Sequence, residues 1–179
     1  MNKFFKIIGA AILILICLLL LIMGLFWGNV KWGNYSKGKE AIRYQKEVCD
    51  TITTVNGKID FTLSGFSKEE IRQVRFYLVR NKLIMRDSVV KVDVNPVVEY
   101  QKVMLPFDKV SITDQVIVKA GNRYFQLAGL SYRAKYNYGM FGPVGDCECA
   151  LDGFEKINGT MAGSGWLIKK YGLLNYPLQ

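Results

Sequence analysis

Two cysteines stand one residue apart in the segment YGMFGPVGDCECALDGF, residues 138–154. Thiols at close spacing can serve redox chemistry or metal binding, or they can be structural. A structural zinc site needs four ligands, but the chain has no histidine, and only Cys49, Cys147 and Cys149 lie outside the apolar N-terminal segment. Redox pairs are normally spaced Cys-x-x-Cys. We therefore expect structural cysteines, no bound metal and no cofactor.

Strand geometry places the two thiols on one face. Residues two apart in a strand point the same way, so Cys147, Cys149 and Leu151 are predicted to face the core. A bridge between Cys147 and Cys149 would close a tight ring against the extended backbone. A bridge from Cys49 to either of them is easier in an oxidising compartment, and simple core packing of the thiols is the alternative.

The absence of histidine also limits catalysis. It excludes Ser-His-Asp and Cys-His hydrolases and histidine acid–base chemistry. Carboxylate pairs such as Asp146 and Glu148 could flank a glycosidic bond, but any acidic strand face would look the same. We expect no catalytic residue and no enzymatic activity.

Aromatic residues concentrate between Tyr124 and Phe141, and the run ends in a loop rich in glycine and proline at residues 138–145. Aromatic loops on a β scaffold often carry recognition, although many such rings fill the core instead. This loop is the predicted partner-binding site, with the candidate residues Tyr136, Tyr138, Met140, Phe141 and Val144.

The elements that position these residues begin with an apolar segment. Residues 7–27, IIGAAILILICLLLLIMGLFW, contain no charge and would form about 31 Å of helix, enough to cross a bilayer. The run is longer than the apolar region of a secretory signal peptide and lacks a small-x-small cleavage site. It predicts an uncleaved transmembrane anchor that follows a short cytoplasmic head, residues 1–6.

Residues 28–47 are basic and contain several aromatic rings. Rings at headgroup depth and ammonium groups near lipid phosphates are typical of an interfacial segment, although a solvated linker has the same composition. The candidate membrane-interface residues are Trp27, Lys31, Trp32, Lys37 and Lys39. The net charge of +9 is otherwise interleaved with acidic residues, so we expect membrane lipid and not nucleic acid as a partner.

Two signals disagree on membrane orientation. Positive charge after the apolar segment favours a cytoplasmic C-terminal side. A short N-terminal head and the cysteine content favour an exported domain. We expect the domain to lie outside the cytoplasm, on the extracytoplasmic or periplasmic side of the cell (inner) membrane.

Residues 48–179 have the pattern of a β-rich domain. Asn56-Gly57 predicts a hairpin, and residues 120–122 predict a second one. A turn is expected at residues 80–82, and Pro96 ends one strand run. The sequence SKEE at residues 67–70 predicts a capping box and one short helix. Many short strands at close spacing indicate a mainly β fold, a β-sandwich or a small barrel-like domain.

We expect the chain to be a single-pass, membrane-anchored envelope protein whose β-rich domain is a non-catalytic binding module. Its partner would be a protein or another envelope component. The alternative is an accessory structural subunit of a larger membrane complex. The sequence does not indicate an oligomeric state.

Overall fold

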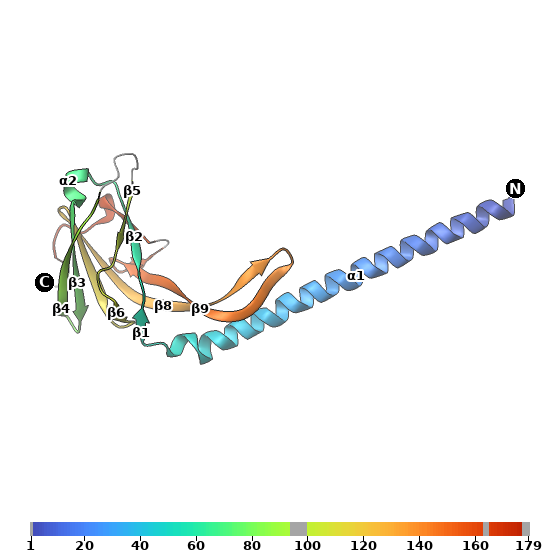
Figure 1. Ribbon diagram of the computed structural model, residues 1–179, viewed down its shortest axis with the longest axis horizontal. Coiled ribbons are helices and arrows are strands. Elements are labelled where there is room, and N and C mark those ends of the chain that lie inside the picture. The colour runs from blue at the N-terminus through green and yellow to red at the C-terminus, as the bar shows by residue number, and fades with distance from the viewer. Residues whose placement is uncertain (1, 94–99, 163–164, 177–179) are drawn as a thin grey trace. The chain divides into compact units, whose positions relative to one another are not determined.

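The computed structural model describes residues 2–93, 100–162 and 165–176. One long helix, α1 (Asn2–Glu47), is followed by a β-rich region with a short helix, α2 (Lys68–Ile71), and two 3₁₀ turns, η1 (Cys49–Thr51) and η2 (Lys169–Tyr171) (Figure 1). The strands are β1 (Thr54–Asn56), β2 (Asp60–Ser64), β3 (Gln73–Arg80), β4 (Leu83–Lys91), β5 (Tyr100–Met104), β6 (Lys109–Ser111), β7 (Gln115–Ala120), β8 (Arg123–Gly139), β9 (Gly142–Ile157), β10 (Thr160–Met161) and β11 (Trp166–Ile168).

The chain divides into two compact units. The first unit contains Met1–Gln45 and Ala134–Glu148, and the second contains Lys46–Arg133 and Cys149–Gln179. Strands β8 and β9 contribute to both units, because their ends near the turn belong to the first and their other halves to the second. We call the first unit the helix–hairpin unit and the second the β-domain.

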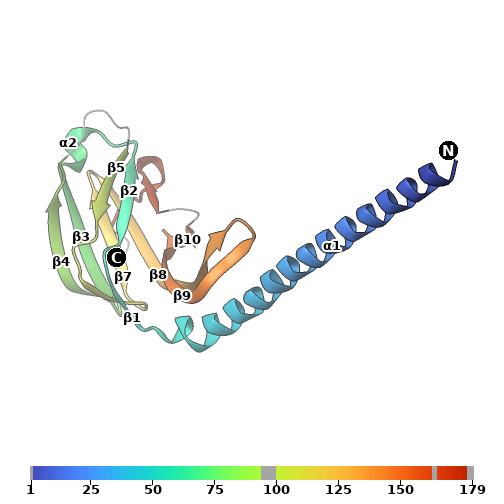
Figure 2. The ribbon, with the colours of Figure 1, turned by 45° about the vertical axis from the view of Figure 1, so that its right-hand side comes forward.

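The sheets confirm the predicted β-rich, sandwich-like fold. Six strands pair in the order β10-β9-β8-β7-β3-β4, three in the order β11-β2-β5, and β1 pairs with β6. In the β-domain, the three-stranded sheet packs on the six-stranded sheet, as the stacked rings of Phe61 and Phe76 show (Figure 2). The short helix begins with the predicted capping box, in which Ser67 and Glu70 satisfy each other's backbone N–H groups.

Alternating side chains of both sheets build the core of the β-domain. Val74, Phe76 and Leu78 of β3 are buried, as strand periodicity requires. They join an apolar cluster from the neighbouring strands that includes Phe61, Leu63, Val103, Val116, Val118, Phe125, Leu127 and Leu167. This apolar cluster gives the β-domain a hydrophobic core of its own.

One of the two predicted hairpins and the predicted turn at residues 80–82 are confirmed. The turn between β3 and β4 places Asn81 and Lys82 at φ of 50° and 65°, as a tight two-residue hairpin requires. Strands β7 and β8 are joined at Gly121-Asn122.

The hairpin predicted at Asn56-Gly57 is wrong. Strand β1 pairs with β6, whereas β2 pairs with β5 and β11. Ile59 is buried and its carbonyl accepts a hydrogen bond from the N–H of Leu105, so the chain crosses from one sheet to another and does not reverse. Pro96 lies outside the described residues.

Two other segments differ from their predicted conformation. Residues 28–47, expected as a linker, continue α1 without a break. Residues 138–145, expected as a loop, form the end of a long hairpin in which only Met140 and Phe141 turn the chain. Both differences arise within the helix–hairpin unit, where the site residues are concentrated.

Candidate functional site

The end of the β8–β9 hairpin lies along α1 in the helix–hairpin unit (Figures 1 and 2). Several contacts join them. The ring of Phe141 packs edge-on against Phe26, with 5.3 Å between ring centroids. Lys37 donates a 2.7 Å hydrogen bond to the carbonyl of Gly145.

Two further contacts extend the interface along the helix. Gly142 lies so close to Asn34 that a Cβ at residue 142 would overlap the asparagine side chain, which would then have to shift. Its φ of 133° also favours glycine. The carbonyl oxygen of the Gln45 side chain accepts a 2.7 Å hydrogen bond from the N–H of Ala134, on the strand β8 side.

The helix residues that contact the hairpin fall on one face. They are Phe26, Asn34, Lys37 and Gln45, and successive members are eight, three and eight residues apart. Residues three, four or eight apart lie on the same side of an α-helix. Ala41 and Tyr44, which are partly covered, follow the same spacing. Phe26, Asn34 and Gln45 were not predicted as site residues, although this spacing within a charged segment could have indicated a packed helical face.

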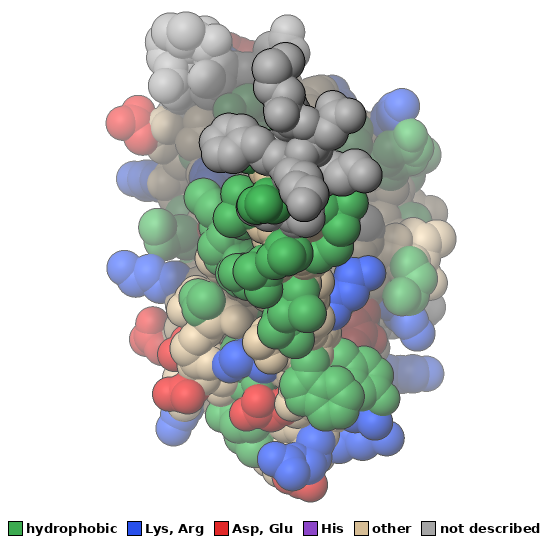
Figure 3. Space-filling model, turned by 90° about the vertical axis from the view of Figure 1, so that its right-hand side faces the viewer, with side chains coloured by type: hydrophobic (Ala, Val, Ile, Leu, Met, Phe, Trp, Pro, Cys, Tyr) green, Lys and Arg blue, Asp and Glu red, His purple; other side chains and the backbone are tan. Residues whose placement is uncertain are grey.

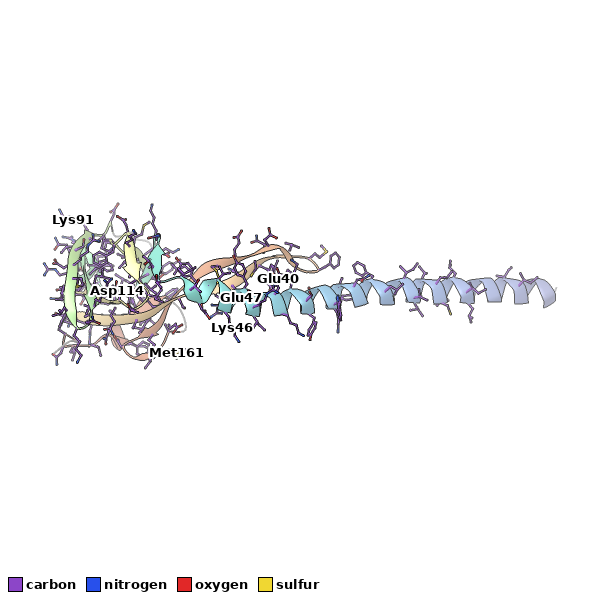
Figure 4. All side chains as sticks on the ribbon, turned by 90° about the horizontal axis from the view of Figure 1, so that it is seen from below. Glu40, Lys46, Glu47, Lys91, Asp114 and Met161 are labelled. Atoms are coloured by element: carbon purple, nitrogen blue, oxygen red, sulfur yellow. A yellow bond between two sulfur atoms is a disulfide. The ribbon has the colours of Figure 1, made fainter. Side chains whose placement is uncertain are left out.

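Tyr136 occupies the centre of this interface and is 5% exposed. The ammonium group of Lys37 lies 4.5 Å from the centroid of its ring. Burial, the neighbouring Glu40 carboxylate and the Cys147 thiol all raise the pKa of the Tyr136 hydroxyl, so it stays protonated. Glu40 is labelled on α1 in Figure 4. Tyr136 therefore joins the hairpin to the helix, and its side chain is not presented to a partner.

The other predicted partner-binding residues lie at the exposed end of the hairpin. The exposed fractions are 92% for Met140, 76% for Tyr138, 55% for Phe141 and 49% for Val144. We call residues 138–145 the hairpin tip. Its side chains are apolar or aromatic, and none of its residues is charged.

The cysteines agree with the sequence analysis. Cys49 and Cys149 form a disulfide within the β-domain, which selects one of the two predicted partners. Cys147 is a buried free thiol, and Cys17 is an exposed free thiol on α1. Within the described residues, no group of three or more His, Cys, Asp or Glu side chains is placed to hold a metal ion.

The large apolar side chains of α1 that are described between Ile7 and Trp27 are exposed. In Figure 3, which looks toward the N-terminal end of the helix, hydrophobic side chains are visible beside the grey atoms. By length and composition, α1 is the one helix in the described residues that could cross a membrane. A signal sequence passes the same test, so the structure supports a membrane anchor or a signal sequence.

The predicted membrane-interface residues have different surroundings. Trp27 and Trp32 are more than half exposed, and the ring centroids of Trp32 and Tyr35 are 6.2 Å apart. Lys39 lies over the ring of Tyr35. Lys31 is exposed, whereas Lys37 is partly covered and bonded to the hairpin as described above.

A second exposed apolar surface lies in the β-domain, at the turn end of β4. Leu83, Ile84 and Met85 are 68%, 51% and 54% exposed. The register between β3 and β4 shifts here, so Met85 has no partner on β3 and forms a bulge at the open edge of the sheet. Arg86, next in the strand, holds its guanidinium 5.4 Å from the Phe107 ring centroid. We call Leu83, Ile84 and Met85 the β4 patch.

The neighbouring buried carboxylate has a structural role. Asp114, labelled in Figure 4, is 1% exposed and accepts hydrogen bonds of 2.6 and 3.0 Å from Arg80 and one of 2.9 Å from the N–H of Ser111. Burial alone raises the pKa of Asp114, but these hydrogen bonds outweigh it, so the pKa is lower than usual. The ion pair fixes the loop before β7 to the end of β3.

The chain matches no known protein family, and it has no significant similarity to a curated protein or to a solved structure.

Proposed function

We propose that this chain is a single-pass, membrane-anchored protein of the cell envelope whose β-domain acts outside the cytoplasm as a non-catalytic binding module. The observation that carries the proposal is the continuity of α1. Its apolar side chains from Ile12 to Trp27 are all exposed. The helix continues unbroken to Glu47, two residues before the disulfide cysteine Cys49.

Exposed apolar side chains on a helix are unfavourable in water and favourable in lipid. Each central Leu, Ile or Phe contributes about −0.3 to −0.6 kcal/mol to membrane insertion, so a run of this length supports a stable span. The disulfide between Cys49 and Cys149 supports an oxidising, extracytoplasmic location for the β-domain.

The β4 patch supports a binding role. The domain has a well-formed core, so its exposed Leu83, Ile84 and Met85 are not required to complete that core. Apolar side chains grouped at an open sheet edge are typical of protein contact surfaces. Lys82 and Arg86 flank the patch, which favours a protein partner with an apolar surface bordered by acidic residues.

The test is photo-crosslinking in native membranes with the full-length chain. A photoreactive residue at Ile84 should give a discrete crosslinked product, whereas one at Met161, which is exposed on the same domain, should not. Once the crosslinked partner is identified, a variant of it that lacks the acidic residues around its apolar surface should compete less well for the β4 patch. Crosslinks from Leu20 on α1, with none from Ile84, would instead favour the alternative role as an accessory subunit of a membrane complex.

The location is tested in the same membranes. Protease added to the outer face of the cell membrane should digest the β-domain and leave α1 protected. A protected β-domain would contradict the proposed orientation, and a mature chain that begins near residue 28 would contradict the anchor.

A further inference from the structure

We propose that the hairpin tip, residues 138–145, inserts into the surface of the bilayer that α1 spans and forms a second membrane contact of the same chain. The inference rests on the proposed function, because it requires residues 7–27 to cross a bilayer. It assigns to the tip a lipid ligand instead of the protein partner that the sequence suggested.

The contacts with α1 set the depth of the tip. Ala134 is bonded to Gln45, Gly145 to Lys37, and Phe141 packs on Phe26. From Gln45 to Phe26 the helix rises about 28 Å, and from Ala134 to Phe141 a strand extends about 23 Å. The similar lengths show that the hairpin follows the helix lengthwise and that its turn points toward the apolar segment.

The end of the hairpin therefore reaches the boundary of the apolar segment. Phe26 is the penultimate residue of the uncharged run 7–27. Lys31, the first charged residue after that run, lies about 7.5 Å farther along the helix. This is the separation expected between the acyl boundary and lipid phosphates, so Phe141 lies at the level where apolar side chains meet headgroups.

The tip exposes the side chains that such a position requires. Met140, Tyr138 and Val144 are not covered by the helix, and Phe141 remains 55% exposed while it contacts Phe26. The main chain of the tip pairs within the hairpin, except at the two-residue turn, so few backbone groups would lose water on insertion.

The charged side chains of the hairpin lie away from its turn. Residues 138–145 carry no charge, whereas the strands bear Lys135, Asp146 and Glu148 farther from the turn. The apolar tip is also continuous with the apolar face of the helix through the pair Phe26–Phe141. This continuity favours the lipid surface over a separate protein as the group that covers the tip.

The test uses full-length protein reconstituted in phosphatidylcholine–phosphatidylglycerol vesicles that contain lipids spin-labelled near the headgroup. A fluorophore is attached to cysteine in three variants of a Cys17→Ser chain: Met140→Cys, Met161→Cys and Leu21→Cys. The remaining thiol, Cys147, is buried, and Cys49 and Cys149 are oxidised. Met140 and Met161 are matched because both are highly exposed methionines near hairpin turns.

We expect the label at Met140→Cys to be quenched about twofold more strongly than the label at Met161→Cys, as for a group at headgroup depth. The label at Leu21→Cys should be quenched by lipids that carry the spin label deep in the acyl chain, which reports the span itself. Quenching at residue 21 without quenching at residue 140 would overturn the tip inference and leave the proposed anchor intact. A lack of quenching at both positions would overturn both. A blue-shifted but unquenched label at residue 140 would show that protein, either a second copy or another chain, covers the tip, and would also overturn the inference.

Discussion

The helix–hairpin unit and the β-domain differ in whether their apolar side chains are exposed or buried. In the β-domain, residues such as Phe76, Phe125 and Leu167 are at most 1% exposed and pack against one another. In the helix–hairpin unit, the apolar side chains of α1 and of the hairpin tip are exposed, and a few polar and aromatic contacts join helix and hairpin. The β-domain therefore has a core that stabilises its fold, whereas the exposed apolar side chains of α1 are those of a membrane anchor or a signal sequence.

The largest expected difference lies between two phenylalanines of the same hairpin. Phe125→Ala removes a buried ring from the core and should lower the free energy of unfolding of the β-domain by about 3–5 kcal/mol. Phe141→Ala removes an exposed ring at the turn and should leave the melting temperature of the β-domain nearly unchanged. Thermal or denaturant unfolding in detergent measures both, and an equal loss in the two variants would place Phe141 in a core.

A second comparison uses the ion pairs of the β-domain. Asp114→Ala removes a buried carboxylate that accepts hydrogen bonds from Arg80 and from the N–H of Ser111, and it should cost about 2–3 kcal/mol. Asp152 pairs with the well-exposed Arg133, so Asp152→Ala should cost less than about 1 kcal/mol. Denaturant titration of both variants distinguishes a buried pair from a surface pair.

The Asp114 pair also predicts a pH dependence. Because the folded-state pKa of Asp114 is lower than its ordinary value of 3.8, the pair stabilises the domain above that value. The stabilisation is lost as the pH falls from the ordinary value through the folded pKa. Asp114→Asn should show a flatter stability profile than the native chain in this acidic range. Parallel profiles for the two proteins would contradict the assignment.

The disulfide should contribute less than the apolar core to the free energy of unfolding of the β-domain. Cys49→Ala removes a cross-link between residues 100 apart and should cost about 2–4 kcal/mol, with the β-domain still folded. Cys17→Ala, at an exposed thiol outside the β-domain, is the control and should have no effect on its melting. Loss of folding in Cys49→Ala would show that the apolar core is insufficient by itself.

The smallest effect is expected within the helix–hairpin unit. Gln45→Ala removes the acceptor for the N–H of Ala134, so hydrogen exchange at that amide should become faster. Amides of β3 and β7 should exchange as before, because their hydrogen bonds lie in the β-domain. Exchange that accelerates throughout both units would show that they unfold together.

The sequence predicted more of the β-domain than of the helix–hairpin unit. Local rules were sufficient for the turn at Asn81-Lys82 and for the capping box of Ser67 and Glu70. The hairpin predicted at Asn56-Gly57 does not form, because β1 pairs with β6, which is distant in the sequence, although the dipeptide favours a turn.

The helix–hairpin unit depends on contacts that local rules do not contain. Glycine-rich residues 138–145 resemble a loop, but hydrogen bonding between β8 and β9 extends both strands to the turn. Gly142 combines a φ of 133° with a close approach to Asn34, more than a hundred residues earlier in the chain. Charge in residues 28–47 is compatible with a linker or with a helix, and packing of the hairpin on one helical face distinguishes them.

Non-reducing peptide mapping of the full-length protein, extracted from its native membrane and alkylated before digestion, tests the central claim most directly. The account predicts that peptides from residues 7–27 are retained, that Cys49 is linked to Cys149, and that Cys17 and Cys147 are free thiols. An N-terminus near residue 28 would show that the apolar segment is a cleaved leader. Alkylated Cys49 and Cys149 without prior reduction would contradict an oxidised, extracytoplasmic β-domain.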